Sequence, residues 1–312
     1  MTALTLKRRI PQLDIAVVRS PELGVIGVGE GTTIGFPRHF FEYLKFKPRQ
    51  FFAEAEPTWK LGIRFLWGPR KEFFYTFSYE FQQRQPELAR NNGFYFDEST
   101  PWTGLVSAFM AQGKAFPRRP DGLPRFHNNH AYHVENRKLV GWLENLCRAL
   151  GVVIHDATVT SETGGNGIAA LVTETGERFT ADLYVDASGF RSELLGRALG
   201  EPFLSYGDAL FCDRAVIGGW PRTTEPVLPY TTAETMDAGW CWQIEHENFI
   251  NRGYVYSAAF LDDDAARAEF LRKNPQVTTE PRVVRYRPDD AGVRARRDVI
   301  GVGNAVAGVD PL

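Results

Sequence analysis

Two tryptophans stand one residue apart at positions 240 and 242, in the segment Gly-Trp-Cys-Trp-Gln-Ile. On a β-strand, residues i and i+2 point to the same face, so Trp240 and Trp242 would form one rigid aromatic wall. Such a wall could shield a reactive group from water. Taken alone, the pair is better explained as core filling, because tryptophan is highly buried on average.

A lysine that could do chemistry lies on another predicted strand, at residues 59–65. Lys60 shares one face of that strand with Gly62 and Arg64, and apolar residues occupy the other face. By periodicity alone, it is therefore most simply a solvated lysine. As an ammonium, the side chain can donate hydrogen bonds, and as a desolvated neutral amine it can act as a nucleophile. The sequence does not choose between these two roles.

Three glycine-containing segments could each bring the backbone close to a ligand. They are residues 27–32 (Gly-Val-Gly-Glu-Gly-Thr), 186–191 (Asp-Ala-Ser-Gly-Phe-Arg) and 301–304 (Gly-Val-Gly-Asn). Each could also be an ordinary turn, because glycine reaches backbone conformations that other residues avoid. The glycine spacing of the last segment does not match the dinucleotide-binding fingerprint.

In their order along the chain, these segments and the final Val-Asp-Pro-Leu of residues 309–312 resemble the flavin-dependent tryptophan halogenases. That family has its essential lysine in an aromatic-Lys-x-x-Ile-Lys-Phe stretch, and residues 59–65 align with it without a gap. The resemblance implies that Lys60 is catalytic and holds or covalently carries hypohalous acid beside the substrate. It also implies that Trp240 and Trp242 separate the flavin from the substrate.

The resemblance further implies which residues contact FAD. In the family, a Gly-x-Gly-Glu-Ala-Thr loop lies against the flavin, and Gly31 stands where alanine is usual. A Gly-Asp turn after the last sheet strand contacts the ribityl chain in similar folds, and Asn304 occupies the Asp-like position. The cofactor-binding residues expected are Gly27, Gly29, Glu30, Gly31, Thr32, Asp186, Gly189, Gly303 and Asn304.

The expected substrate pocket is lined by Phe74, Tyr75, Thr76 and His133. His133 stands where the family often has a Tyr-His or Trp-His pair before a long helix, and Thr76 lies near the position of a histidine that packs on free tryptophan. The spacing of His127, His130 and His133 could suggest a metal site. No convincing carboxylate ligand accompanies them, so no metal is expected.

The sequence departs from the family pattern at three places. It lacks the opening glycine-rich pyrophosphate loop, and it stops at the Pro-Leu after which the family has a catalytic glutamate. Glu245 replaces the proline of the family's Trp-x-Trp-x-Ile-Pro. The first two departures suggest a fragment. Glu245, together with Thr76, argues against free tryptophan as the substrate.

Three hypotheses about function follow. The first is a halogenase that acts on an electron-rich aromatic substrate, tryptophan-like, indole-like or phenol-like, using dioxygen, halide and reduced FAD from a separate flavin reductase. The second is an FAD-dependent monooxygenase that hydroxylates an aromatic substrate. The third is a catalytically inactive fragment or binding remnant of such an enzyme.

The helices and strands expected around these residues indicate an α/β protein that is α+β in part. We expect a Rossmann-like FAD-binding domain, without its first strand and glycine-rich loop, interleaved with an antiparallel-sheet substrate domain. Residues 1–36, 131–200 and 295–312 are assigned to the FAD-binding domain, and 37–130 and 201–294 to the substrate side. The clearest signal is a helix at 135–150, where apolar residues recur at helical spacing before a strand at 152–155. Further helices are predicted at 37–46, 192–199 and 262–273, and further strands at 14–18, 183–186, 211–220, 240–246, 253–260 and 298–302.

Composition narrows the range of partners. The chain has 36 basic and 38 acidic residues and a formal charge of −2, so it shows no electrostatic footprint for nucleic acid or an anionic membrane. Its three cysteines, widely spaced and odd in number, fit a reducing compartment. No export signal and no apolar run of about 18 residues is found, so a cytoplasmic protein with a small-molecule substrate is expected.

Overall fold

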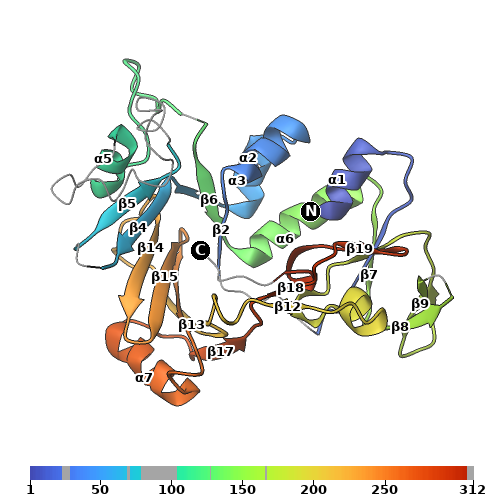
Figure 1. Cartoon of the computed structure of the whole chain (residues 1–312). Helices are drawn as coiled ribbons and strands as arrows, with labels where there is room; N and C mark the ends of the chain where they lie inside the picture. The colour runs from blue at the N-terminus through green and yellow to red at the C-terminus, as the bar shows by residue number, and fades with distance from the viewer. Residues whose placement is uncertain (23–28, 69–70, 79–103, 127, 166, 308–312) are drawn as a thin grey trace, which may run out of the picture.

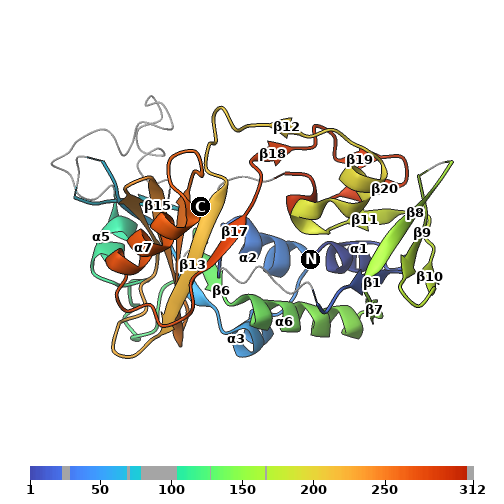
Figure 2. The ribbon, with the colours of Figure 1, turned by 90° about the horizontal axis from the view of Figure 1, so that it is seen from below.

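The computed structural model describes residues 1–22, 29–68, 71–78, 104–126, 128–165 and 167–307. Gly27 and Val28 of the 27–32 segment, His127, and the Val-Asp-Pro-Leu of residues 309–312 lie outside these ranges. The fold is a mixture of helices and strands, with a large sheet at one end and a small hairpin at the other (Figures 1 and 2). The predicted mixed α/β class is thus confirmed.

The large sheet has seven strands and carries both tryptophans. Its strands, in spatial order, are β17 (Arg282–Arg285), β13 (Arg214–Pro221), β16 (Phe249–Tyr256), β15 (Gly239–Glu245), β14 (Thr231–Met236), β4 (Gly62–Leu66) and β5 (Phe73–Thr76). Neighbouring strands are antiparallel except β14 and β4, which are parallel. Helix α7 (Asp263–Lys273) covers one face, where Phe270 packs against Cys241 and Tyr254. The tryptophans therefore lie on the opposite face.

Helix α7 begins where its sequence predicts. The Asp262 carboxylate accepts a hydrogen bond from the Ala265 backbone N–H at 2.8 Å, which satisfies one of the free donors of the first turn. Acidic residues stand in the first turn and basic residues in the last, in line with the helix dipole. The strand β16 begins at Phe249, earlier than predicted, so the turn before it is shorter than residues 247–251.

Lys60 belongs to a smaller sheet that is separate from the large one. It contains β2 (Glu30–Gly31), β6 (Ala131–Val134) and β3 (Thr58–Lys60), with β6 in the middle. The prediction of one strand over 59–65 is wrong, because the chain changes sheet at Leu61. The Leu61 N–H donates to the carbonyl of Pro229 at 2.8 Å. At Gly62 a side chain is excluded, since a Cβ atom would lie 2.2 Å from the Tyr75 carbonyl oxygen.

Parallel strand pairs supply the Rossmann-like part of the fold. Strand β1 (Ala16–Arg19) pairs with β7 (Val153–Asp156), and β11 (Tyr184–Asp186) pairs with β20 (Val299–Gly301). Helix α6 (Asn136–Ala149) confirms the predicted helix and packs on α1 (Thr2–Arg9) and α3 (Pro48–Ala55), with Trp142 buried in the core that they share. The assignment of whole residue ranges to two domains stays a prediction.

Further helices and strands complete the fold. They are α1 (Thr2–Arg9), α2 (Gly35–Pro37), a π-helix (Arg38–Tyr43), α3 (Pro48–Ala55), α5 (Leu105–Ala111), β8 (Val159–Gly164), β9 (Gly167–Thr173), β10 (Arg178–Phe179), η2 (Gly189–Arg191), η3 (Glu193–Ala198), β12 (Leu204–Ser205), β18 (Asp289–Asp290), β19 (Ala295–Arg296) and η4 (Gly303–Ala305). The β8–β10 sheet was not predicted. Within the described ranges, none of the helices has the length and apolar character that crossing a bilayer requires.

Candidate active site

Trp240 and Trp242 form the aromatic wall that the sequence predicts. Both indoles are buried on the same face of β15, with ring centroids 6.1 Å apart and ring planes at 57°. Both tryptophans belong to a hydrophobic cluster against which Ile63 of β4 and Phe190 of η2 pack. Gly253 on β16 makes room for it, since a Cβ atom there would lie 1.9 Å from Cζ2 of Trp242. The shared face of the two tryptophans is thus confirmed.

The turns containing Gly189 and Gly303 lie side by side. Each follows the carboxyl end of a strand in the parallel β11–β20 pair, in which Asp186 is opposite Gly301. Both glycines have positive φ angles, 70° and 60°, and η2 contacts η4 directly. Carboxyl ends of parallel strands are the usual place for ligands in open α/β sheets. Asn304 is exposed at this edge, where a ligand could reach it.

Asp186 has a structural task in this turn. Its Oδ1 accepts hydrogen bonds from the backbone N–H and the hydroxyl of Ser188, and its Oδ2 accepts from the N–H groups of Leu194 and Leu195. A carboxylate has about four acceptor positions, and protein donors take all of them. The Asp186 carboxylate therefore has little capacity left to accept a hydrogen bond from a cofactor. Its predicted contact with the cofactor stays a prediction.

The Gly29–Thr32 loop runs along the edge of the small sheet. Glu30 pairs with Val134 and Gly31 with His133 across to β6, and the Thr32 hydroxyl accepts from the Tyr132 N–H at 2.9 Å. The Glu30 carboxylate accepts from Asn136 Nδ2 at 3.2 Å. The loop is thus held in place by the strand that carries His133.

Lys60 is buried rather than solvated. Only 2% of the residue is exposed, because β3 belongs to the small sheet and its side chain points toward Gly31. Its Nζ lies 5.7 Å from the centroid of the Phe77 ring. Among the described residues, no hydrogen-bond acceptor or carboxylate partner is found for the amine. Burial lowers the pKa of Lys60 to about 8, so the neutral amine becomes accessible near neutral pH.

His133 is buried directly beside this lysine. Its Nε2 lies 2.8 Å from the Thr231 hydroxyl and its Nδ1 lies 3.5 Å from the Thr58 hydroxyl. Burial, followed by the charges of Lys60 and His246, holds the pKa of His133 well below its usual range. The imidazole is therefore neutral, and it does not add a second positive charge to the site.

The other predicted pocket residues do not line one common wall with His133. Phe74 is in the core formed with Leu61 and Met110, whereas Tyr75 is partly exposed on the other face of β5. The Thr76 hydroxyl donates to the Ser78 carbonyl at 3.1 Å. Their contact with a substrate stays a prediction.

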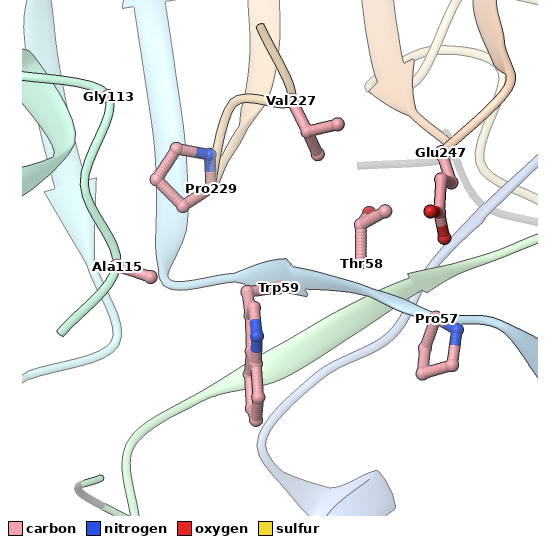
Figure 3. A pocket seen from close by; sticks show the side chains of 8 residues that line it. All are labelled: Pro57, Thr58, Trp59, Gly113, Ala115, Val227, Pro229 and Glu247. Carbon is pink, nitrogen blue, oxygen red and sulfur yellow. The ribbon is translucent and has the colours of Figure 1, made fainter. Parts of the chain in front are cut away.

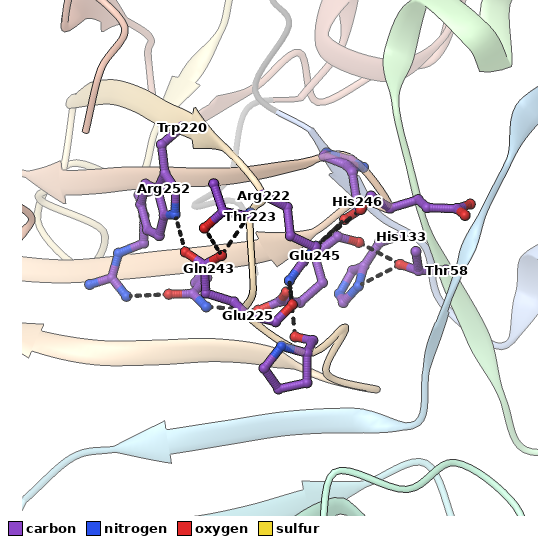
Figure 4. Close-up of polar contacts among 12 residues, drawn as sticks. Thr58, His133, Trp220, Arg222, Thr223, Glu225, Gln243, Glu245, His246 and Arg252 are labelled. Atoms are coloured by element: carbon purple, nitrogen blue, oxygen red, sulfur yellow. Dashed lines mark hydrogen bonds and ion pairs between the residues drawn. The ribbon is translucent and has the colours of Figure 1, made fainter. Parts of the chain in front are cut away.

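A buried polar network at the end of β15 was not predicted (Figure 4). Arg222 and Glu245 form an ion pair of 2.5 Å, with 7% and 1% of their side chains exposed. Gln243 Nε2 donates to the same carboxylate at 2.7 Å. Arg222 also donates to four backbone carbonyls, those of Glu225, Pro226, His246 and Glu247. The sequence signal was Glu245 itself, a charged residue in place of the family's proline.

His246 brings a further buried nitrogen to the Gly29 loop. Among the described residues, its Nε2 has no hydrogen-bond partner, and a Cβ atom built on Gly29 would lie 2.8 Å from this nitrogen. Burial, followed by the charges of Arg222 and Lys138, lowers the pKa of His246 to about 4. This histidine was not predicted as part of the site.

A pocket of about 280 Å³ opens next to the strand that carries Lys60 (Figure 3). Its lining residues are Pro57, Thr58, Trp59, Gly113, Ala115, Val227, Pro229 and Glu247. None of the four residues predicted for the substrate pocket is among them. Thr58 belongs both to this lining and to the polar network, so the pocket adjoins the candidate site.

Several proteins similar to this chain are named as tryptophan halogenases. It is 30% identical to the tryptophan 6-halogenase ThaL of Streptomyces albogriseolus, over 100% of the chain and 64% of ThaL. It is 29% identical to the tryptophan 7-halogenase RebH of Lentzea aerocolonigenes, over 96% of the chain and 61% of RebH. The structure of MibH, described as a "lathipeptide tryptophan 5-halogenase", superimposes with a TM-score of 0.84 and 38% identity, over 100% of this chain and 60% of MibH.

The chain thus spans a little under two thirds of the length of these proteins. The match to the family model, in contrast, covers the whole of this chain. The tryptophan halogenase family model matches residues 1–312, and the chain therefore belongs to the tryptophan halogenase family.

Proposed function

We propose that this protein is an FAD-dependent halogenase that transfers halogen from hypohalous acid to an electron-rich aromatic ring, with Lys60 as the residue that delivers it. The observation that carries the proposal is the enclosed Lys60 amine, which has no counter-charge among the described residues and lies against Gly31. A lysine with only a structural role would be expected at the surface or paired with a carboxylate.

FAD fits the part of the chain formed by β11 and β20. The backbone at Gly189 and Gly303 can approach a ligand closely because neither residue has a side chain, and a Cβ atom at either would meet nothing within 4 Å. Reduced FAD supplies the activation of dioxygen by which halide is oxidised to hypohalous acid. The reduced cofactor would come from a separate flavin reductase.

The Lys60 side chain can act in either of two ways. As an ammonium it donates a hydrogen bond to the oxygen of hypohalous acid and polarises the oxygen–halogen bond. As a neutral amine it attacks the halogen, so that a nitrogen–halogen bond forms while the oxygen–halogen bond breaks, and the amine proton leaves with hydroxide as water. Both roles benefit from a site without bulk water, since water would compete for the donor.

The tryptophan wall would separate the cofactor from the substrate. Phe190, in the turn that also contains Gly189, packs on the hydrophobic cluster to which Trp240 and Trp242 belong, so this cluster adjoins the proposed FAD site. The substrate class that we propose is an indole ring. MibH, the relative whose description includes a peptide, is the reason to include a tryptophan side chain within a peptide beside free tryptophan.

The first test is FAD binding by the chain, followed by flavin fluorescence during titration. Micromolar affinity supports the proposal, and absence of binding contradicts it for this polypeptide. Gly303→Ala should weaken binding by about tenfold, because alanine disfavours the positive φ by roughly 1–2 kcal/mol and the free protein would leave the backbone conformation that binds the ligand. The matched control is Gly176→Ala, which also alters a positive-φ glycine in open space, but in the turn between β9 and β10.

The second test is the dependence of product on halide. Purified protein, a flavin reductase, FAD, oxygen and an indole substrate are incubated with and without bromide or chloride, and the products are identified by mass spectrometry. The proposal predicts a product that carries halogen and forms only with halide. A hydroxylated product that forms equally well without halide would indicate a monooxygenase instead.

A further inference from the structure

The amine of Lys60 occupies space that a side chain at position 31 would take. A Cβ atom built on Gly31 would lie 2.7 Å from Lys60 Nζ and 3.6 Å from its Cδ. The first distance is well inside van der Waals contact, for which about 3.5–4.0 Å is optimal between carbon atoms. The amine thus rests against the backbone of the Gly29–Thr32 loop.

Among the residues that the structure describes, the groups found next to the amine come from several elements, and none of them is an anion. The Thr231 hydroxyl, at the start of β14, would lie 3.4 Å from the same Cβ atom. The His133 imidazole of β6 contacts the Thr231 hydroxyl, and the Phe77 ring lies near the amine. His246 is the next titratable group beyond His133. The Glu30 carboxylate accepts from Asn136 instead of Lys60. Such surroundings favour the uncharged amine, because an isolated buried ammonium is costly.

We propose that Gly31 is a positioning residue for Lys60: its missing side chain leaves the enclosed space in which the reactive amine rests, and a methyl group there displaces the amine. The inference rests on the proposed role of Lys60 as the halogen carrier. The space at Gly31 thereby sets how much of the amine is uncharged and ready to receive halogen.

The test follows the protonation of Lys60 directly. The Gly31→Ala variant and the parent protein are acetylated briefly with dilute acetic anhydride across a pH series, and the Lys60 peptide is quantified by mass spectrometry. The exposed Lys47 in the same sample corrects for the reagent. The parent should show a midpoint near pH 8, the pKa that burial gives Lys60. In Gly31→Ala the midpoint should rise by about one pH unit or more, which is a tenfold smaller uncharged fraction near neutral pH.

The control is Gly141→Ala, which places the same methyl group where nothing lies within 4 Å. It should leave the midpoint unchanged. An unchanged midpoint in Gly31→Ala, with the protein folded, would overturn the proposal. The labelling needs neither FAD nor halide, so it can succeed even when halogenation by the parent protein fails, and the two proposals are tested separately.

A double-mutant cycle covers the case in which Gly31→Ala destabilises the fold. The unfolding midpoint in urea is measured for Gly31→Ala, Lys60→Ala and the double variant. Because Lys60 is the group that the new methyl meets, its removal should abolish most of the destabilisation caused by Gly31→Ala. Strict additivity of the two changes would show that the methyl clashes with something else, and the proposal would fail.

Discussion

The Thr58 hydroxyl donates a hydrogen bond to the backbone carbonyl of Glu245, across the boundary between the sheet of Lys60 and the sheet of the tryptophan wall. Thr58 begins β3, which ends at Lys60, and Glu245 ends β15, which carries Trp240 and Trp242. The two parts of the candidate site are therefore joined by a buried contact. The carboxylate of Glu245 is fixed in turn by Arg222.

Removing the Glu245 charge should destabilise the protein strongly. Glu245→Gln leaves the Arg222 guanidinium buried without its carboxylate, and breaking such a pair costs about 3–5 kcal/mol. Since Arg222 keeps its four backbone acceptors, we expect a loss near the lower end, about 3 kcal/mol in the free energy of unfolding measured by urea denaturation.

The matched control for this variant is Glu162→Gln. Glu162 pairs with Arg178 at 2.6 Å, but the two side chains are 48% and 50% exposed. Exposed pairs contribute less than about 1 kcal/mol, so this variant should unfold close to the parent. Equal effects of the two substitutions would mean that the Arg222–Glu245 pair stabilises the protein no more than an exposed ion pair does.

The tryptophan wall should be disturbed by a single methyl group at Gly253. A Cβ atom there would lie 1.9 Å from the Trp242 ring, so Gly253→Ala must move the indole or the strand. Overpacking of this kind costs about 1–3 kcal/mol and should change the near-ultraviolet circular dichroism of the tryptophans. Gly141→Ala, which meets nothing, serves as the control. An unchanged spectrum in Gly253→Ala would argue against the packing described for Trp242.

The stability of the protein should fall as the pH drops from about 6.5 towards 4. Burial lowers the pKa of His246 to about 4, so in this range the unfolded chain binds more protons than the folded one. Between pH 7 and pH 5 this histidine alone should remove about 2 kcal/mol from the free energy of unfolding.

The variant His246→Gln tests this account. It should lose about 2 kcal/mol less than the parent over the same pH interval, since glutamine does not titrate. Urea unfolding curves at pH 7 and pH 5 measure the difference. The buried His133 remains in the variant and contributes in the same direction. A pH dependence identical to that of the parent would show that His246 is not neutral in the folded state.

Local patterns sufficed to predict the tryptophan wall and the long helix α6. Side chains alternate between the two faces of a strand, so Trp240 and Trp242 share a face whenever their segment forms a strand. Helix α6 has apolar residues at helical spacing over its whole length, so its prediction did not depend on distant contacts.

The burial of Lys60 could not be predicted in this way, because contacts distant in sequence determine it. Its strand ends at Lys60, the next residue Leu61 donates a backbone hydrogen bond to Pro229, and the Lys60 side chain faces Gly31. Alternation along residues 59–65 assumes one unbroken strand and therefore gave the wrong face. The Arg222–Glu245 pair was missed for the same reason, since its partners meet only when β13 and β15 lie in one sheet.

The most direct test of the account is the fate of oxidant and product in Lys60→Ala, compared with Lys47→Ala, which removes an exposed lysine. Consumption of reduced FAD and formation of halogenated indole are measured in the same reaction. We predict that Lys60→Ala consumes reduced FAD as the parent does but loses halogenated product by at least about a hundredfold, while Lys47→Ala retains both. Halogenation that persists in Lys60→Ala would remove this lysine from the mechanism.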